Sequence, residues 1–196
     1  MQSPHNISDI SREWINLSKI FFAAQVFLNK KYTKNLLSVD DFSYIDFKKL
    51  TSIWKKWMIL DVDDCIAPHH GEIITENKNI IFKLLWKGWK IVIFSNMKKS
   101  QRYEELESKW IEVITSPYPK PSKKWFEACL ENLWLKAVEV VMIWDNFLTD
   151  GGSRNAGIDF IKVSPIEKDD IKSFSRICHK FTRRIADVIA YRRKDI

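Results

Sequence analysis

Hydrophobic residues in the middle of the chain gather in short runs, and stretches with the residue spacing of helices separate these runs. A run without polar alternation is typical of a strand buried on both faces of a parallel sheet. Helices are expected near residues 76–87, 99–109 and 121–133. The alternation of strands and helices predicts a three-layer α/β fold of Rossmann type with a mostly parallel five-stranded sheet. The five expected strands are Met58–Val62, Lys90–Phe94, Ile111–Thr115, Glu139–Ile143 and Asp159–Val163.

Two further helices are expected outside this alternating region. Residues 9–30 are apolar over more than one face, so they either lie in a membrane interface or dock on the domain. Residues 168–193 form a basic amphipathic helix, which suits an anionic membrane surface or packing on the core. Residues 31–57 are expected to form an irregular connection with a short helix near Phe47 to Trp54. The pattern divides the chain into an N-terminal helix with its connection (1–50), a central domain (51–165) and a C-terminal basic helix (166–196).

Composition indicates a folded chain with a substantial core. The 196 residues are 45% hydrophobic and 29% charged, which is typical of a globular protein and not of a disordered one. The widely spaced Cys65, Cys129 and Cys178 form no metal-binding or redox pair, so they favour a reducing, cytoplasmic setting. We expect no secretory signal and no membrane-spanning segment, because no stretch is apolar enough.

The positive charge is concentrated near the C-terminal end. Between residues 171 and 194, eight basic residues stand against one acid, Asp187, an excess that equals the whole formal charge of +7. The rest of the chain is near neutral, which argues against a nucleic-acid partner. The basic helix leaves open a peripheral position at the inner face of the membrane.

Three carboxylates directly follow the first hydrophobic run, at Asp61, Asp63 and Asp64. In a parallel sheet, ligands bind at the carboxyl ends of the strands. Carboxylates so close together raise one another's pKa unless a cation lies among them, and hard oxygen ligands suit Mg²⁺. Taken alone, the stretch is more typical of a solvated acidic turn than of a metal site.

Polar residues of other kinds follow the later strands. Ser95 and Asn96 follow the second strand, and Lys120 precedes the helix expected at 121. Asp145 follows the fourth strand, with Asp150 five residues further on. Because the carboxyl ends of parallel strands share one edge, these side chains are expected to converge with the acids after the first strand.

This set of groups suits phosphoryl transfer. A carboxylate can attack a phosphoryl group and form an aspartyl-phosphate. A second carboxylate two residues further on can protonate the leaving oxygen and then activate water. A hydroxyl group, an ammonium group and Mg²⁺ can neutralise the charge on the phosphoryl oxygens.

The ordered motifs DVDDC, Ser95-Asn96, Lys120-Pro121 and Asp145 through Asp150 resemble those of haloacid dehalogenase-like phosphatases. The longer segments DVDDCIAPHHGEI, IVIFSNM, YPKPSKKWF and DNFLTDGGSRNAGIDFIKVSP resemble the small uncapped branch that contains phosphatidylglycerophosphate phosphatases. The resemblance covers roughly residues 40–165 and implies the haloacid dehalogenase fold without a cap domain. The gaps between the motifs are too short for a cap, and an open site suits a headgroup presented by a membrane.

The resemblance implies a role for each residue of the cluster. Asp61 would be the nucleophile and Asp63 the general acid and base. Phosphate would be bound by Ser95, Asn96 and Lys120, and Mg²⁺ by Asp61, Asp63 (through its backbone carbonyl), Asp145 and Asp150. The implied reaction is Mg²⁺-dependent hydrolysis of a phosphomonoester, with phosphatidylglycerophosphate as substrate in phospholipid metabolism.

The chain departs from the family pattern at three positions. Asp64 stands where this branch usually has Asn, and Cys65 where the wider superfamily often has Thr. Trp144 stands where Gly is expected, and its ring could obstruct the cleft. His69 and His70 invite a zinc site, although a flap beside the active site fits them better.

Three other functions stay open on the sequence alone. The first is a phosphatase for a soluble sugar phosphate, nucleotide or phosphoprotein. The second is a response-regulator receiver, which also clusters acids, a hydroxyl and a lysine, but here the third strand ends without the acid a receiver needs. The third is an inactive scaffold of the same fold.

Tryptophan is abundant and glycine scarce, at nine and five residues. Trp110 and Trp134 each follow an expected helix, at the position where a left-handed backbone favours Gly. By the family resemblance, Gly is also expected at Trp54, Trp57, Trp125 and Trp144. Some genetic codes read UGA as Gly where others read Trp. These positions therefore predict glycine in the natural protein.

Overall fold

The computed structural model describes residues 36–95, 101–115, 123–145 and 152–166, together with the single positions 24, 181 and 184. The helices expected at 9–30 and 168–193 fall outside these stretches, so they stay predictions. Within the described stretches, no helix has the length and apolar character needed to cross a membrane.

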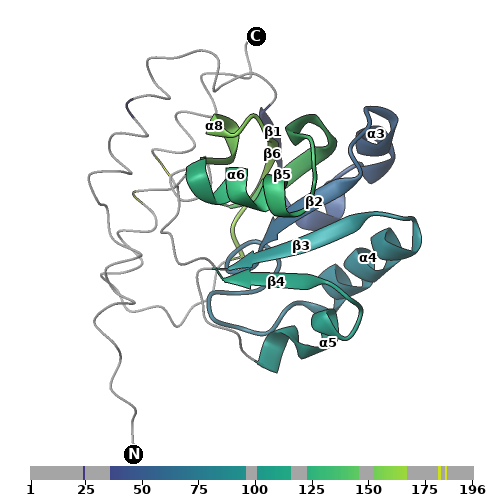
Figure 1. The fold of residues 1–196 in the computed structure, drawn as a ribbon. Coiled ribbons are helices and arrows are strands. Elements are labelled where there is room, and N and C mark those ends of the chain that lie inside the picture. Colours follow the sequence, from purple (N-terminus) through teal and green to yellow (C-terminus); the bar gives the residue numbers. More distant parts are fainter. Residues whose placement is uncertain are drawn as a thin grey trace, which may run out of the picture.

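The described strands form one parallel sheet in the order β1-β6-β5-β2-β3-β4 (Figure 1). Strand β2 lies in the middle, between β3 and β5. From β2 the chain runs outward through β3 to β4 and then returns to the other side at β5, so the strand order reverses at β2. The strands are β1 (Leu36–Val39), β2 (Trp57–Asp61), β3 (Lys90–Ser95), β4 (Glu112–Thr115), β5 (Val140–Trp144) and β6 (Asp159–Val163).

The α/β fold and its five expected strands are confirmed, but the sheet contains a sixth strand that the sequence did not predict. Strand β1 lies at the edge and pairs in parallel with β6, in a stretch expected to be an irregular connection. Its four residues are too few to produce a recognisable pattern, and its pairing partner is more than 100 residues away in the sequence. The short helix expected near Phe47 to Trp54 is confirmed as α3 (Phe47–Ser52), capped by the side chain of Asp46.

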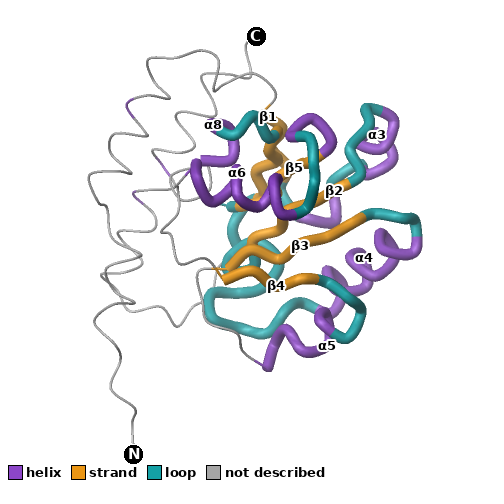
Figure 2. Tube along the Cα trace, in the orientation of Figure 1, coloured by secondary structure: helices purple, strands orange, loops and turns teal. Residues whose placement is uncertain are grey.

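Helices cover both faces of the sheet (Figure 2). Helix α4 (Thr75–Trp86) and helix α5 (Glu104–Glu107) lie on one face, and α6 (Lys123–Asn132) and α8 (Gly152–Asn155) lie on the other. Three short 3-10 helices complete the described elements: η2 (Phe42–Tyr44), η3 (Gln101–Tyr103) and η4 (Ala137–Glu139).

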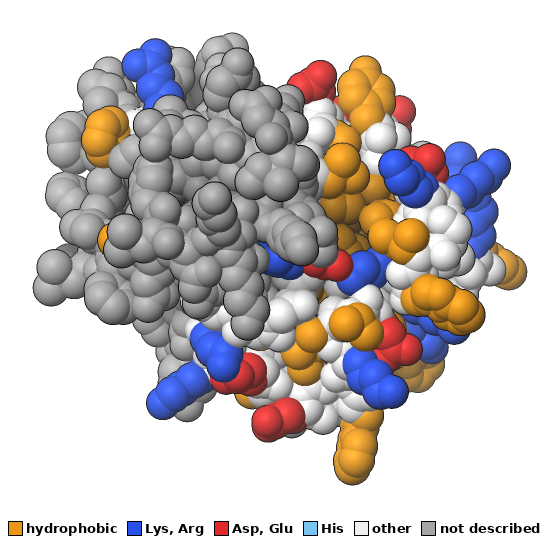
Figure 3. All heavy atoms as spheres, turned by 90° about the horizontal axis from the view of Figure 1, so that it is seen from above, with side chains coloured by type: hydrophobic (Ala, Val, Ile, Leu, Met, Phe, Trp, Pro, Cys, Tyr) orange, Lys and Arg blue, Asp and Glu red, His pale blue; other side chains and the backbone are white. Residues whose placement is uncertain are grey.

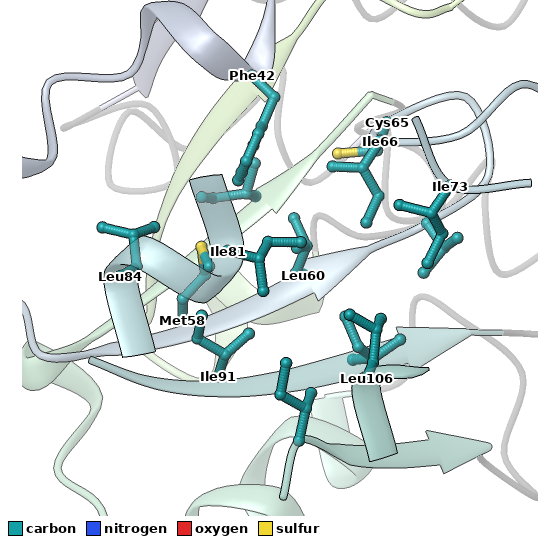
Figure 4. Close-up of a cluster of buried hydrophobic side chains, with 14 of the residues drawn as sticks. Phe42, Met58, Leu60, Cys65, Ile66, Ile73, Ile81, Leu84, Ile91 and Leu106 are labelled. Atoms are coloured by element: carbon teal, nitrogen blue, oxygen red, sulfur yellow. The ribbon is translucent and has the colours of Figure 1, made fainter. Parts of the chain in front are cut away.

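Each face of the sheet has its own hydrophobic cluster. Along β2, Met58 and Leu60 belong to one cluster and Ile59 to the other, because successive side chains of a strand point to opposite faces. The first cluster packs under α4 and α5 (Figure 4). The second packs under α6, where Phe126 meets Phe94 of β3 with ring centroids 5.7 Å apart. Because hydrophobic side chains cover both faces of the sheet, polar side chains are expected at the carboxyl ends of its strands.

Each described α-helix is followed within three residues by a residue with positive φ. After α4 and α8 this residue is a glycine, Gly88 or Gly157. After α3, α5 and α6 it is Trp54, Trp110 or Trp134, with φ of 67°, 64° and 54°. These three tryptophans are 73%, 95% and 94% exposed, and Figure 3 shows large hydrophobic side chains projecting from the described surface. The expected left-handed conformation after the helices is therefore confirmed at Trp110 and Trp134.

Candidate active site

Three of the expected site residues stand side by side at the carboxyl edge of the sheet. Asp61 is the last residue of β2, Ser95 is the last residue of β3, and Asp145 directly follows β5. Strand β2 pairs with both of its neighbours, so the three residues end adjacent strands about 4.8 Å apart. Their exposed fractions are 9%, 1% and 5%. The structure thus brings together the polar groups that the sequence placed at separate strand ends.

The remaining expected site residues are distributed differently. Asp63 lies in the loop after β2, two residues beyond Asp61, and is described. Asn96, Lys120 and Asp150 lie outside the described residues, so their expected roles stay predictions.

The loop after β2 is a tight turn closed by its own backbone. The carbonyl oxygen of Val62 accepts hydrogen bonds from the N–H groups of Cys65, Ile66 and Ala67, at 3.2, 3.0 and 3.1 Å. Asp64 lies within this turn with a φ of 62°, a left-handed conformation that Asn and Asp tolerate better than most residues. Asp64 can therefore replace the usual Asn of this branch without changing the backbone.

The side chain of Asp63 is held by a buried arginine. Nη1 and Nη2 of Arg102 donate to the two carboxylate oxygens of Asp63, at 2.8 and 2.9 Å. The backbone N–H of His70 donates to Oδ1 of Asp63 at 2.9 Å. Side-chain exposure is 5% for Arg102 and 20% for Asp63, so the ion pair is largely shielded from water. A two-pronged contact of this kind fixes the orientation of the carboxylate as well as its position.

The same arginine is connected to Ser95, at the end of β3, through its neighbour Tyr103. Nη2 of Arg102 donates to the hydroxyl oxygen of Tyr103, and the Tyr103 hydroxyl donates to Oγ of Ser95 at 3.0 Å. Tyr103 is fully buried. Asp63 after β2 and Ser95 at the end of β3 are therefore joined by a continuous chain of hydrogen bonds.

The pKa shifts follow from these contacts. Burial alone would raise the pKa of Asp63, but the hydrogen bonds and charge of Arg102, with a smaller effect of His70, lower it overall. Burial would lower the pKa of Arg102, whereas its contacts with Asp63 raise it above its usual value. Burial raises the pKa of Tyr103, so its hydroxyl stays protonated and can donate to Ser95. Asp63 is therefore an ionised carboxylate at neutral pH.

Sequence reasoning missed Arg102 and Tyr103. Both lie in η3, inside a region expected only as a helix near 99–109. The Arg-Tyr pair shortly after the end of β3 could have drawn attention to these residues. However, the neighbouring sequence does not show whether such an arginine is buried or exposed to solvent. Its role depends on how the loops after β2 and β3 meet.

The histidines after Asp64 do not make a convincing zinc site. Ligand atoms of Asp63, His69 and His70 lie within 4.8 Å of one another. However, the guanidinium of Arg102 already contacts both carboxylate oxygens of Asp63, so a cation there would face a fixed positive charge. The structure agrees better with the expected loop beside the active site.

Trp144 lies in the hydrophobic layer under α6. It is fully buried in the cluster on that face, and its ring packs edge-on against Phe160 with centroids 5.0 Å apart. Residues 140, 142 and 144 of β5 share that face because side chains alternate along a strand. The expectation that this ring obstructs the cleft is therefore wrong.

A parallel sheet covered on both faces, with carboxylates at the ends of the central strands, is the arrangement expected of the haloacid dehalogenase-like phosphatases that the motifs resemble. The chain belongs to the family described as mitochondrial PGP phosphatase, whose model matches residues 17–151. The resemblance inferred from the motifs is thereby confirmed. A comparison with curated proteins found no match.

Several solved structures are similar to the chain. An uncharacterized protein from Listeria monocytogenes serotype 4b is 18% identical, with 60% of this chain and 85% of that chain covered and a TM-score of 0.45. The cobalt-bound deoxy-D-mannose-octulosonate 8-phosphate phosphatase from Haemophilus influenzae is 13% identical, with 69% and 92% covered and a TM-score of 0.44. A 3-deoxy-D-manno-octulosonate 8-phosphate phosphatase from Moraxella catarrhalis, in complex with magnesium, phosphate and KDO, is 12% identical, with 75% and 99% covered and a TM-score of 0.45. The family assignment rests on the family match alone.

Proposed function

We propose that the chain is a Mg²⁺-dependent phosphomonoesterase that forms an aspartyl-phosphate on Asp61 and converts phosphatidylglycerophosphate to phosphatidylglycerol. The family match supports phosphatase activity. The observation that carries the proposal is the position of Asp61. It ends the central strand where the strand order reverses, with Ser95 and Asp145 at the ends of the two neighbouring strands.

The donor groups at this edge suit a divalent cation. Asp61 and Asp145 stand at neighbouring strand ends and are 9% and 5% exposed. Two carboxylates brought so close favour a cation between them, and hard oxygen ligands suit Mg²⁺. These two side chains and the backbone carbonyl of Asp63 would hold the ion, with Asp150 as a further ligand. When bound, Mg²⁺ would offset the negative charge of the phosphoryl group.

The proposed reaction has two halves. Asp63 is ionised in the free site, so it must first take up a proton from solvent. A carboxylate oxygen of Asp61 then attacks phosphorus, the bond from phosphorus to the alcohol oxygen breaks, and Asp63 passes its proton to that oxygen. Asp63 then takes a proton from water, the water oxygen attacks phosphorus, and the bond to Asp61 breaks to release inorganic phosphate. The hydroxyl of Ser95 and the ammonium of Lys120 bind the phosphoryl oxygens throughout.

A lipid headgroup is proposed as substrate for two reasons. Among the described residues, the crossovers after β2 and β3 contain only short helices and loops, with no additional domain above the site. A site without a cap domain can accept a phosphate presented by a surface. The basic stretch between residues 171 and 194 would also favour an anionic membrane.

The test is phosphate release from phosphatidylglycerophosphate in mixed micelles, compared with a panel of soluble sugar phosphates, nucleotides and phosphopeptides, with and without Mg²⁺. We expect the lipid to be preferred and activity to require the metal. Asp61→Asn should abolish turnover, whereas Asp40→Asn, at an exposed carboxylate after β1, should leave it unchanged. Preference for a soluble monoester would identify a different phosphatase, and no turnover of any substrate would indicate an inactive scaffold.

A further inference from the structure

Arg102 holds the carboxylate of Asp63 from two sides at once. Its two terminal nitrogens contact different oxygens of Asp63, at 2.8 and 2.9 Å. A single donor would let the carboxylate rotate about its terminal bond, whereas this planar fork does not. With the N–H of His70 as a third donor, Asp63 is restricted to one orientation.

Arg102 is itself held firmly in place. Its Nη1 also donates to the carbonyl oxygen of Gly71 at 3.1 Å, and its guanidinium carbon lies 4.8 Å from the centre of the Tyr103 ring. The residue is only 9% exposed. A buried guanidinium needs a fixed anionic partner because burying an isolated charge is costly. Arg102 therefore ties η3 to the loops that follow β2.

Tyr103 extends this connection to the end of β3. Its hydroxyl accepts from Arg102 and donates to Ser95 at 3.0 Å, and both Tyr103 and Ser95 are buried. Arg102 and Tyr103, which are adjacent in sequence, thus contact two side chains that have different roles in the proposed reaction. Asp63 moves protons, and Ser95 binds the phosphoryl group.

We propose that Arg102 is a positioning residue that sets the orientation of Asp63, and that Tyr103 links this orientation to the position of Ser95. The expected effect of Arg102 on turnover rests on the proposed function. The expected effect of Arg102 on the orientation of Asp63 does not. Arg102 contacts Asp63 through both terminal nitrogens and is almost completely buried. Its loss should therefore impair the chemical steps more than substrate binding.

The kinetic test uses p-nitrophenyl phosphate with Mg²⁺ and three variants. Arg102→Met should lower kcat by roughly 10- to 100-fold with KM changed less than about 2-fold, since a small misplacement of a catalytic group has effects of that size. Arg102→Lys, which keeps the charge but loses the fork, should restore part of the lost kcat. Tyr103→Phe should cause a smaller decrease in kcat. A raised KM with unchanged kcat would assign Arg102 to substrate binding and overturn the proposal, as would unchanged kinetics in all variants.

The matched control is Lys78→Met. It removes another ion pair between the same two crossovers, β2 to β3 and β3 to β4, formed by Lys78 of α4 and Glu105 of α5 at 2.7 Å. Neither residue is a hydrogen-bond or ion-pair partner of Asp63, so kcat and KM should not change. If Arg102→Met fails to fold, Arg102→Lys and Tyr103→Phe still test the positioning role, because each substitution keeps most of the side-chain packing.

Crystal structures of the wild type, Arg102→Lys and Tyr103→Phe separate this proposal from the proposed function. We expect the Asp63 side chain to leave its wild-type orientation in Arg102→Lys, and the Ser95 side chain to shift in Tyr103→Phe. Unchanged orientations of both side chains would overturn the proposal whatever the activity. An inactive wild type in which the variants still reorient Asp63 would instead contradict the phosphatase assignment.

Discussion

Trp54, Trp110 and Trp134 have a backbone conformation that favours glycine, with φ between 54° and 67°. A left-handed conformation costs a residue with a Cβ about 1–2 kcal/mol, whereas glycine adopts it freely. Trp110 and Trp134 are at least 94% exposed, so glycine there would sacrifice almost no packing. We expect Trp110→Gly and Trp134→Gly each to raise the free energy of unfolding by about 1 kcal/mol in urea titrations.

Trp86→Gly is the control for this prediction. Trp86 is 92% exposed like the others, but it lies within α4 and has no positive φ. Glycine there should lower the free energy of unfolding by less than about 1 kcal/mol, because Trp86 is the last residue of α4 and glycine weakens a helix. If Trp110→Gly and Trp86→Gly lowered stability equally, the conformational argument would be wrong.

The tryptophan pattern leads to a hypothesis about the gene. Trp54, Trp110 and Trp134 stand where Gly88 and Gly157 stand after the other described helices. At Trp57, Trp125 and Trp144 the backbone has no positive φ, so there the argument rests on the family resemblance alone. The hypothesis expects UGA at these codons in an organism that reads UGA as glycine. UGG in the source gene would contradict it.

Cys129 provides a test of burial in the cluster under α6. Burial and, to a smaller extent, Glu112 raise the pKa of its thiol to about 12. The folded state therefore favours the neutral thiol. Its contribution to stability is complete below the ordinary pKa of about 9 and is lost as the pH rises toward 12. We expect iodoacetamide at pH 8 to leave Cys129 unmodified in the native protein and to modify it in urea, as read by peptide mass spectrometry. Rapid native modification would contradict its burial.

At the scale of elements, the segment before β2 belongs to the folded core. Phe42 of η2 is fully buried and packs against Phe47 of α3, with ring centroids 5.7 Å apart. Phe42→Ala should lower the free energy of unfolding by about 3–5 kcal/mol. Tyr44→Ala in the same short helix should change it by less than about 0.5 kcal/mol, because Tyr44 is 71% exposed. Similar effects of the two substitutions in urea titrations would mean that this segment does not pack as described.

The sequence predicted those elements whose signal is local. Buried runs such as Met58–Val62 need no partner to be recognised, and β2 lies within one residue of that expectation. Strand β1 could not be predicted because its four residues are stabilised by pairing with β6. The strand-end acids were predictable because parallel strands end at one edge. The Arg102–Asp63 ion pair was not, because it depends on the meeting of two loops 39 residues apart in sequence.

At the scale of the whole molecule, the charge is divided between a near-neutral domain and a basic C-terminal stretch. We expect glutamate substitution of four arginines in that stretch to weaken sedimentation with anionic vesicles, since each base near such a surface contributes about 1 kcal/mol. The substituted positions are Arg183, Arg184, Arg192 and Arg193. The control replaces four exposed bases outside that stretch with glutamate, at Lys48, Lys83, Lys87 and Lys109. Equal vesicle binding by both variants would show that the C-terminal stretch has no particular role in binding anionic membranes.

The most direct test of the proposed reaction is to trap the phosphorylated enzyme. With p-nitrophenyl phosphate, whose leaving group needs no proton, Asp63→Asn should still become phosphorylated. The second half of the reaction should be slow, because the group that takes a proton from water is missing. Acid quenching of this variant during turnover, followed by peptide mass spectrometry, should show a phosphoryl group on Asp61. The double variant Asp61→Asn, Asp63→Asn should show none. A phosphoryl group on any other residue, or turnover by Asp61→Asn at the wild-type rate, would contradict the assignment of Asp61 as nucleophile.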